Sequence, residues 1–234
     1  MTVNDKTLEN VFIIDNLGNK RRIKSVYIGV KGKAKKIADT ISNLYKYSGT
    51  LTPLSQARCA LAATSIGNYA LFGGGYDSSS YSVVDAYDTS LVRTTPTPLS
   101  QARQYLAATS IGNYALFCGG YNMSSSSFCD VVDAYDTSLV RTTPATLSES
   151  RRILSATSIG NYALFCGGNG GSFYALVDAY DTSLVRTNPT SLLVGRDSLA
   201  ATSIGNYALF GGGRNSSSSY SSVVEAYSVK NILI

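Results

Sequence analysis

The chain repeats one stretch of twelve residues, LAATSIGNYALF, four times. The copies begin at Leu61, Leu106, Leu154 and Leu199, and the third copy reads LSATSIGNYALF. Their starts lie 45, 48 and 45 residues apart, so the sequence from about residue 50 to residue 234 is one unit written four times. Units of this size cannot bury both faces alone and must stack on their neighbours. This repeat constrains the fold more than any other feature of the sequence.

The first three units each contain four short runs that predict β-strands. The first two runs, LAATSI and YALFGG, are separated by a Gly-Asn pair such as Gly67-Asn68. This pair suits a II′ or I′ hairpin because Gly accepts the positive φ that such turns need. A Ser-rich loop leads to a third run, VVDAYD from Val83, and then to a fourth, LVRTTP from Leu91. Four strands in about 45 residues predict a small antiparallel sheet, as in one blade of a β-propeller.

The unit resembles the kelch repeat, in which an Arg precedes two strands, the second strand ends in Gly-Gly, and a Tyr-Asp pair follows. The matching residues are Arg58, Arg103, Arg151 and Arg196, the Gly pairs, and Tyr87-Asp88, Tyr135-Asp136 and Tyr180-Asp181, with Tyr227-Ser228 in the last copy. The kelch Trp is absent, since the chain has no Trp, and most kelch propellers have more blades. The resemblance implies an all-β, four-bladed kelch-like β-propeller over residues 47–234.

The ends of the repeat region suggest how such a ring would close. The last unit stops near its third strand, at Ser228, while residues 47–58 read YSGTLTPLSQAR, which resembles TTPTPLSQAR at residues 94–103. The N-terminal side could therefore supply the outer strand that the last blade lacks and remove an open edge. The tail, residues 229–234, competes for this role. We expect a closed ring whose inner strands carry small residues such as Ala62 and Ala63.

Residues 1–46 form a second, basic region. Residues 1–50 hold ten Lys or Arg against four Asp or Glu, whereas the remaining 184 residues hold ten against eleven. The clusters KRRIK and KGKAKK alternate with apolar residues, which favours the solvated face of a hairpin that serves as a scaffold or docking surface. Contact with an acidic protein or with nucleic acid are the alternatives. We expect a β-rich head with a strand at residues 11–15, a hairpin over residues 22–37, and a short helix or strand at residues 35–44.

The stretch RRIKSVYIGVKGKAKKI, which begins at Arg21, is similar to short repeats near the N-termini of tail-associated proteins in phages and prophages of Gram-positive bacteria. Ser- and Gly-rich kelch-like repeats can follow in those proteins. The resemblance implies a virion protein that docks to other tail proteins through residues 1–46 and forms a homo-oligomer in the particle. The sequence has no apolar run long enough for a membrane span and no secretory signal at its start, which fits synthesis in the bacterial cytoplasm.

Composition argues against catalysis. The chain has no His, which removes His-based general bases, Ser-His and Cys-His pairs, and the commonest metal ligand. The Gly-rich runs end strands and precede no helix, so they do not predict a phosphate-binding loop. The acids recur in register at Asp85, Asp133, Asp178 and Glu225, and at Asp88, Asp136 and Asp181. This symmetry favours hydrogen bonding at turns and strand ends over a glycosidase pair. We expect no enzyme, no catalytic residue and no cofactor.

The four cysteines, Cys59, Cys118, Cys129 and Cys166, show no CxxC spacing. Cys118 and Cys166 occupy the position that is Gly73 in the first copy and Gly211 in the last. This exchange with Gly favours small buried thiols over a disulfide or a metal site. We expect no bound metal.

Binding residues are expected in the loops between the second and third strands, because these loops vary most between the copies. Tyr and Ser dominate them, as they do in antibody loops. The candidates are Tyr76, Tyr81, Tyr121, Tyr174 and Tyr220, with cell-wall polysaccharide as the expected ligand. Flexible solvated loops are the alternative.

The repeated arginines Arg58, Arg103, Arg151 and Arg196 are expected beneath the same face. There they could bind anionic sugars or phosphates, or instead bond backbone carbonyls or a carboxylate of the neighbouring blade. Taken together, the sequence predicts a non-enzymatic tail-associated protein that binds the host surface. A structural or decoration protein of the virion and an intracellular kelch interaction module are the alternatives.

Overall fold

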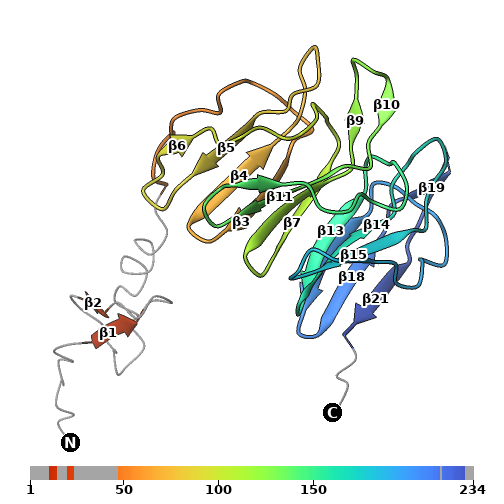
Figure 1. Cartoon of the computed structure of the whole chain (residues 1–234). Helices are drawn as coiled ribbons and strands as arrows, with labels where there is room; N and C mark the ends of the chain where they lie inside the picture. Colours follow the sequence, from red (N-terminus) through yellow and green to blue (C-terminus); the bar gives the residue numbers. More distant parts are fainter. Residues whose placement is uncertain (1–10, 15–19, 24–46, 217, 230–234) are drawn as a thin grey trace, which may run out of the picture. The chain divides into compact units, whose positions relative to one another are not determined.

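The computed structural model describes residues 11–14, 20–23, 47–216 and 218–229, which are coloured in Figure 1. The chain divides into two compact units, Met1–Leu51 and Thr52–Ile234. Every regular element in the described ranges is a β-strand, so the described chain is all-β as the sequence predicted. Within these ranges no helix is long and apolar enough to cross a membrane.

The first unit contains one pair of described strands. β1 (Val11–Ile14) pairs antiparallel with β2 (Lys20–Ile23), and Val11 lies opposite Ile23. β1 confirms the strand predicted at residues 11–15. The predicted helix at residues 35–44 and all but the first two residues of the predicted hairpin at 22–37 lie outside the described residues.

The described part of the second unit contains four antiparallel sheets, one from each repeat. Sheet 1 comprises β3 (Ala62–Ile66), β4 (Tyr69–Gly73), β5 (Val84–Tyr87) and β6 (Arg93–Thr94). Sheet 2 comprises β7 (Ala107–Ile111), β8 (Tyr114–Cys118), β11 (Val132–Asp136) and β12 (Arg141–Thr142). Sheet 3 comprises β13 (Ser155–Ile159), β14 (Tyr162–Cys166), β15 (Val177–Asp181) and β16 (Arg186–Thr187). Sheet 4 comprises β17 (Ala200–Ile204), β18 (Tyr207–Gly211) and β21 (Val224–Ser228).

Two short ribbons extend the loops of the second and fourth repeats: β9 (Tyr121–Asn122) with β10 (Ser127–Phe128), and β19 (Arg214–Ser216) with β20 (Ser219–Tyr220). In each large sheet the strand order follows the sequence, so strands of a sheet that are consecutive along the chain are also neighbours in it. The first hairpin of each sheet turns at Gly-Asn. In sheet 1, Ile66 pairs with Tyr69, and Gly67 has a φ of 53° while Asn68 does not have a positive φ. A positive φ at the first turn residue alone is the II′ pattern.

The four sheets pack side by side through three hydrophobic cores, and Figure 1 shows them arranged as a fan. We call the face of a sheet that lies toward the next repeat its trailing face, and the opposite face its leading face. Each core joins the trailing face of one sheet to the leading face of the next. In the first core, Ile66 and Leu71 of sheet 1 meet Phe117 of sheet 2. The second and third cores repeat this arrangement between sheets 2 and 3 and between sheets 3 and 4.

The fan is open at both ends, which differs from the expected ring. Sheet 4 has three strands, and no described segment pairs with the outer edge of β21. Ile204 is 67% exposed, whereas its counterparts Ile66, Ile111 and Ile159 are 5%, 3% and 5% exposed. The described residues from Thr52 to Arg58 contact sheet 1 instead: the Tyr87 hydroxyl donates to Thr52 O at 2.7 Å and Ser55 bonds Asp85. No closed sheet is found among the described residues.

Candidate functional site

The repeated arginines are internal ion-pair partners. Arg103 Nη2 lies 2.7 Å from Asp133 Oδ2, and both side chains are fully buried. The same pair recurs as Arg58–Asp85 at 2.8 Å, Arg151–Asp178 at 2.6 Å and Arg196–Glu225 at 2.6 Å. Arg103 also donates to Phe117 O at 3.0 Å. These partners match the structural alternative, in which each Arg bonds carbonyls and a carboxylate, except that the carboxylate belongs to the same repeat.

The buried carboxylates are satisfied from several sides. Asp133 also accepts hydrogen bonds from Ser100 and lies 3.3 Å from Arg141 of the outer strand β12. In the first repeat, burial alone would raise the pKa of Asp85, but the hydrogen bonds from Arg58 and Ser55 outweigh burial and lower this pKa. The Asp85 carboxylate is therefore held ionised by these partners. Each guanidinium group of the repeated arginines is paired with a carboxylate, and this arrangement fits a structural role rather than ligand binding.

The second set of repeated acids forms turns. Asp88 Oδ1 accepts the backbone N–H groups of Ser90 and Val92, both at 2.9 Å. Asp136 and Asp181 form the same two bonds in their repeats. The turn role predicted for these acids is therefore confirmed. Within the described ranges, no group of three or more Cys, Asp or Glu side chains could hold a metal ion.

The near-identical repeats differ most at one edge of the fan, which we call the loop edge. Here the residue after each repeated Arg forms a bridge to the residue after each Gly pair: Cys59 to Tyr76, Gln104 to Tyr121, Arg152 to Asn169 and Asp197 to Arg214. The next residue in each copy, Ala60, Tyr105, Ile153 or Ser198, has a positive φ between 51° and 56°. Non-Gly residues at positive φ carry strain and concentrate at functional sites. The backbone of this edge is thus constant while its side chains change.

An arginine surrounded by aromatic rings lies at this edge. The Arg152 guanidinium carbon is 4.9 Å from the centroid of the Tyr121 ring, 5.6 Å from that of Phe128 and 5.8 Å from that of Tyr105. None of the ion pairs between described residues includes Arg152, and its Nε is buried without a hydrogen bond, as are those of Arg103, Arg151 and Arg196. We call Tyr76, Tyr105, Tyr121, Phe128 and Arg152 the aromatic cluster. A guanidinium between aromatic faces retains its donors for an anionic ligand.

Tyr76 joins the aromatic cluster through Tyr105 of the next repeat. The two ring centroids are 5.9 Å apart and the two hydroxyls 3.5 Å apart. This hydrogen bond, with smaller contributions from Cys59, raises the pKa of Tyr76 to about 12. Tyr76 therefore stays neutral at physiological pH.

The other predicted tyrosines lie at the same edge but outside the cluster. The Tyr81 hydroxyl donates to Asp77 at 2.9 Å, and the hydrogen bonds from Ser78 hold the pKa of Asp77 at about 2. Tyr174 is half-buried, and Tyr220 is 80% exposed on β20. Nearby, Arg214 lies 5.4 Å from the Phe173 ring and 2.8 Å from Asp197.

The structure thus brings Tyr76 and Tyr121 together with three residues that the sequence reasoning missed, Tyr105, Phe128 and Arg152. The sequence did carry a signal for Tyr105 and Arg152. The two residues after the repeated Arg read CA, QY, RI and DS, so these positions vary in otherwise similar copies.

All four cysteines are free thiols. Cys118, Cys129 and Cys166 are buried, whereas Cys59 is exposed at the loop edge. Burial raises the pKa of Cys129 and Cys118, and raises that of Cys166 to about 12. The three buried thiols are therefore protonated and poor nucleophiles at neutral pH.

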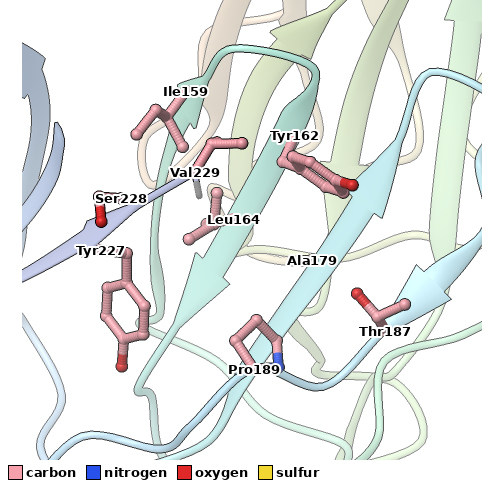
Figure 2. Close-up of a pocket in the computed structure, with 9 residues that line it drawn as sticks. All are labelled: Ile159, Tyr162, Leu164, Ala179, Thr187, Pro189, Tyr227, Ser228 and Val229. Atoms are coloured by element: carbon pink, nitrogen blue, oxygen red, sulfur yellow. The ribbon is translucent and has the colours of Figure 1, made fainter. Parts of the chain in front are cut away.

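A pocket of about 300 Å³ lies between sheet 3 and the end of β21 (Figure 2). Figure 2 shows Tyr162 and Leu164 of β14 and Tyr227 of β21 lining it. At the two earlier junctions, Leu139 and Leu184 from the turn after the third strand pack against the core beside Tyr69 and Tyr114. The fourth repeat reads SVKN where the others read DTSL. The pocket therefore marks the site where the other repeats place a leucine, and it carries no charged group.

Comparison with known proteins adds no relative: no protein family matches the chain, and no curated protein matches it.

Proposed function

We propose that the four sheets are blades of a kelch-like propeller, four to each chain, and that the protein is a non-enzymatic, tail-associated protein of a phage or prophage. In this proposal residues 1–46 dock to other tail proteins, and the loop edge of the propeller binds a glycan of the host surface. The repeat period, the four-stranded sheets and their side-by-side packing support the propeller. The resemblance of residues 21–37 to phage tail proteins supports the location in the virion.

The single observation that carries the binding role is the aromatic cluster. Tyr76, Tyr105 and Tyr121 offer flat apolar faces suited to sugar rings, and the Arg152 guanidinium lies among them without a carboxylate partner within the described residues. An Arg with free donors recognises carboxylate or phosphate groups. The cluster therefore fits an anionic polysaccharide better than a neutral one.

The repeated arginines are not part of this proposed site. Arg58, Arg103, Arg151 and Arg196 are paired with buried carboxylates, and a ligand would have to break those pairs. Of the predicted ligand-binding residues, Tyr76 and Tyr121 are central, while Tyr81, Tyr174 and Tyr220 lie at the same edge and would contact a longer chain of sugars.

The test is binding of the full-length protein to anionic cell-wall polysaccharides of Gram-positive bacteria, measured by isothermal titration calorimetry. The variant Arg152→Gln removes the charge while keeping a polar side chain of similar length. We expect its affinity to fall about tenfold to a hundredfold, as for loss of one charge-assisted contact. The affinity should also fall as salt is raised.

The control is Tyr162→Ser, because Tyr162 is 37% exposed and lines the pocket between sheets 3 and 4 rather than the loop edge. This variant should bind as the wild type does. Equal binding by Arg152→Gln and the wild type would refute the proposed site. No binding of any glycan by the folded wild type would instead support the structural or decoration role, which the exposed ends of the fan also favour.

A further inference from the structure

The three junctions between neighbouring sheets are built in the same way. On the trailing side, Val84, Val132 and Val177 are at most 1% exposed. On the leading side, Ala115, Ala163 and Ala208 are fully buried, as are Phe117, Phe165 and Phe210. The same residue types therefore meet at each junction, because the repeat supplies both faces from the same sequence.

The two ends of the fan present the two halves of a fourth such junction. On the trailing face of sheet 4, Ile204 is 67% and Val224 63% exposed. On the leading face of sheet 1, Ala70 is exposed although its three counterparts are fully buried. Leu91 is 46% exposed, whereas its counterparts Leu139 and Leu184 are partly buried and pack on the preceding sheet. Exposed apolar faces of this kind mark interaction sites.

The backbone repeats the same arrangement. Four hydrogen bonds cross each junction, and in the first they run from Gly75 N–H to Arg103 O, Arg103 N–H to Tyr81 O, Leu99 N–H to Ser82 O and Tyr105 N–H to Ala60 O, at 2.8 to 3.0 Å. The second junction uses Gly120, Arg151, Leu147 and Ile153 as donors, and the third uses Gly168, Arg196, Leu192 and Ser198. The approach is close: a Cβ on Gly74 would lie 2.6 Å from Arg103 O.

At the ends of the fan the corresponding groups have no backbone partner among the described residues. On sheet 4 the groups without a backbone partner are the N–H of Gly213 and the carbonyls of Ser198, Ser221 and Ser222. On sheet 1 they are the carbonyl of Arg58 and the N–H groups of Leu54, Arg58 and Ala60. Sheet 4 thus offers one donor and three acceptors, and sheet 1, at the other end of the fan, offers one acceptor and three donors. The two sets match one for one in the order that the internal junctions use.

We propose that the partner of these faces is a second copy of this chain, stacked head to tail, with the leading face of its sheet 1 on the trailing face of sheet 4. The chemistry favours this partner over an unrelated protein, because the covering face needs the apolar pattern and the backbone pattern of the repeat itself. Head-to-tail contacts of this type close into a ring when the rotation permits. The same contact also removes the two exposed sheet faces.

The second copy also completes the loop edge. At the second and third junctions an aromatic residue on one loop reaches an arginine of the next repeat, as Phe128 reaches Arg152 and Phe173 reaches Arg214. Tyr220 has the corresponding position on the loop of the fourth repeat, where it pairs with Arg214 as Phe128 pairs with Tyr121. Tyr220 is 80% exposed and would contact the Cys59 and Tyr76 edge of the second copy.

The test is sedimentation equilibrium of the full-length protein over a range of concentrations. The wild type should form a discrete oligomer. Ile204→Asp on the trailing face and Leu91→Asp on the leading face should each raise the concentration for half-association about a hundredfold or more, because each places an unpaired carboxylate in an apolar contact. The matched control is Val92→Asp, since Val92 and its counterparts Val140 and Val185 are all 56% to 57% exposed, even beside an internal junction.

Mixing the two impaired variants makes the test specific for a head-to-tail contact. Ile204→Asp keeps an intact leading face and Leu91→Asp an intact trailing face, so the mixture should form a 1:1 heterodimer although neither variant associates alone. A wild type that stays monomeric up to high concentration would overturn the proposal and favour closure within one chain. Association that both Asp variants leave unchanged, or a mixture that fails to associate, would overturn it as well.

Discussion

The Arg103–Asp133 ion pair tests how much the buried charges stabilise the fold. Asp133→Asn keeps the shape of the side chain but leaves Arg103, whose side chain is fully buried, without a counter-charge. We expect the free energy of unfolding to fall by about 3–5 kcal/mol, the usual cost of breaking a buried pair by removing one partner. Urea denaturation followed by fluorescence from the tyrosines measures this change.

Glu225→Gln is the matched control for that measurement. Glu225 forms the equivalent pair with Arg196, but its side chain is 16% exposed, and Arg196 also donates to Val223 O at 2.8 Å. Water and these other partners should reduce the loss. Equal costs for the two variants would show that burial does not decide the strength of these pairs.

Thiol reactivity provides a second test at single residues. Cys59 is exposed, while Cys118, Cys129 and Cys166 are buried with raised pKa values. A protonated buried thiol reacts slowly because the thiolate is the nucleophile. In dilute native protein at pH 8, a thiol reagent should therefore modify one cysteine rapidly and the other three only after denaturation. Rapid reaction of two or more thiols would contradict the packing described for the sheets.

The last residue of the second strand is Gly in the first and fourth sheets and Cys in the second and third, and its environment differs between the two glycines. A Cβ added at Gly73 would lie 2.8 Å from the Phe117 ring, whereas one at Gly211 would lie 3.2 Å from a methyl group of Val224, which is 63% exposed. We expect Gly73→Ala to lower the free energy of unfolding by about 1–3 kcal/mol, the cost of overpacking. Gly211→Ala should change it little, because Val224 can move. Thermal denaturation at low protein concentration compares the two, and the opposite order would refute this packing argument.

The strands and turns were predictable because local chemistry determines them. Gly67-Asn68 between two apolar runs encodes its hairpin, and Asp88 encodes the turn that follows the third strand. The partners of the repeated arginines were not predictable from spacing, since Arg103, which precedes the first strand, meets Asp133 of the third strand only once the sheet has formed. The aromatic cluster needed the fold for the same reason: Tyr76, Tyr121 and Arg152 come from three different repeats.

For the whole molecule, the sequence predicted both the stacking of four units and a closed ring, and the described residues show the stacking but no closed ring. The count of strands suggested that residues 47–58 would complete the last sheet, yet Thr52 and Ser55 of that segment contact sheet 1. The curvature of a stack depends on how faces such as those of Phe117 and Leu71 interlock, which no local pattern encodes. The pocket beside Tyr227 was not predictable for the same reason. It lies where the turn after the third strand places a leucine in the other repeats.

The open ends of the fan also make stability depend on concentration. If a second copy covers Ile204 and Val224, it binds the folded chain and not the unfolded one, and mass action then raises the midpoint of thermal unfolding with protein concentration. Each tenfold rise in total concentration above the dissociation constant adds about 0.7 kcal/mol per chain for a dimer and up to about 1.4 kcal/mol for a large ring, because the free chain that acts as the ligand rises more slowly than the total. Differential scanning calorimetry at concentrations spanning two decades should therefore show a rising midpoint for the wild type and for Val92→Asp, and a constant midpoint for Ile204→Asp. Cys59 should become less reactive over the same range, because its counterparts Gln104 and Asp197 are 3% and 0% exposed at internal junctions. A wild-type midpoint that does not change with concentration would show that the four sheets are stable with both end faces in water.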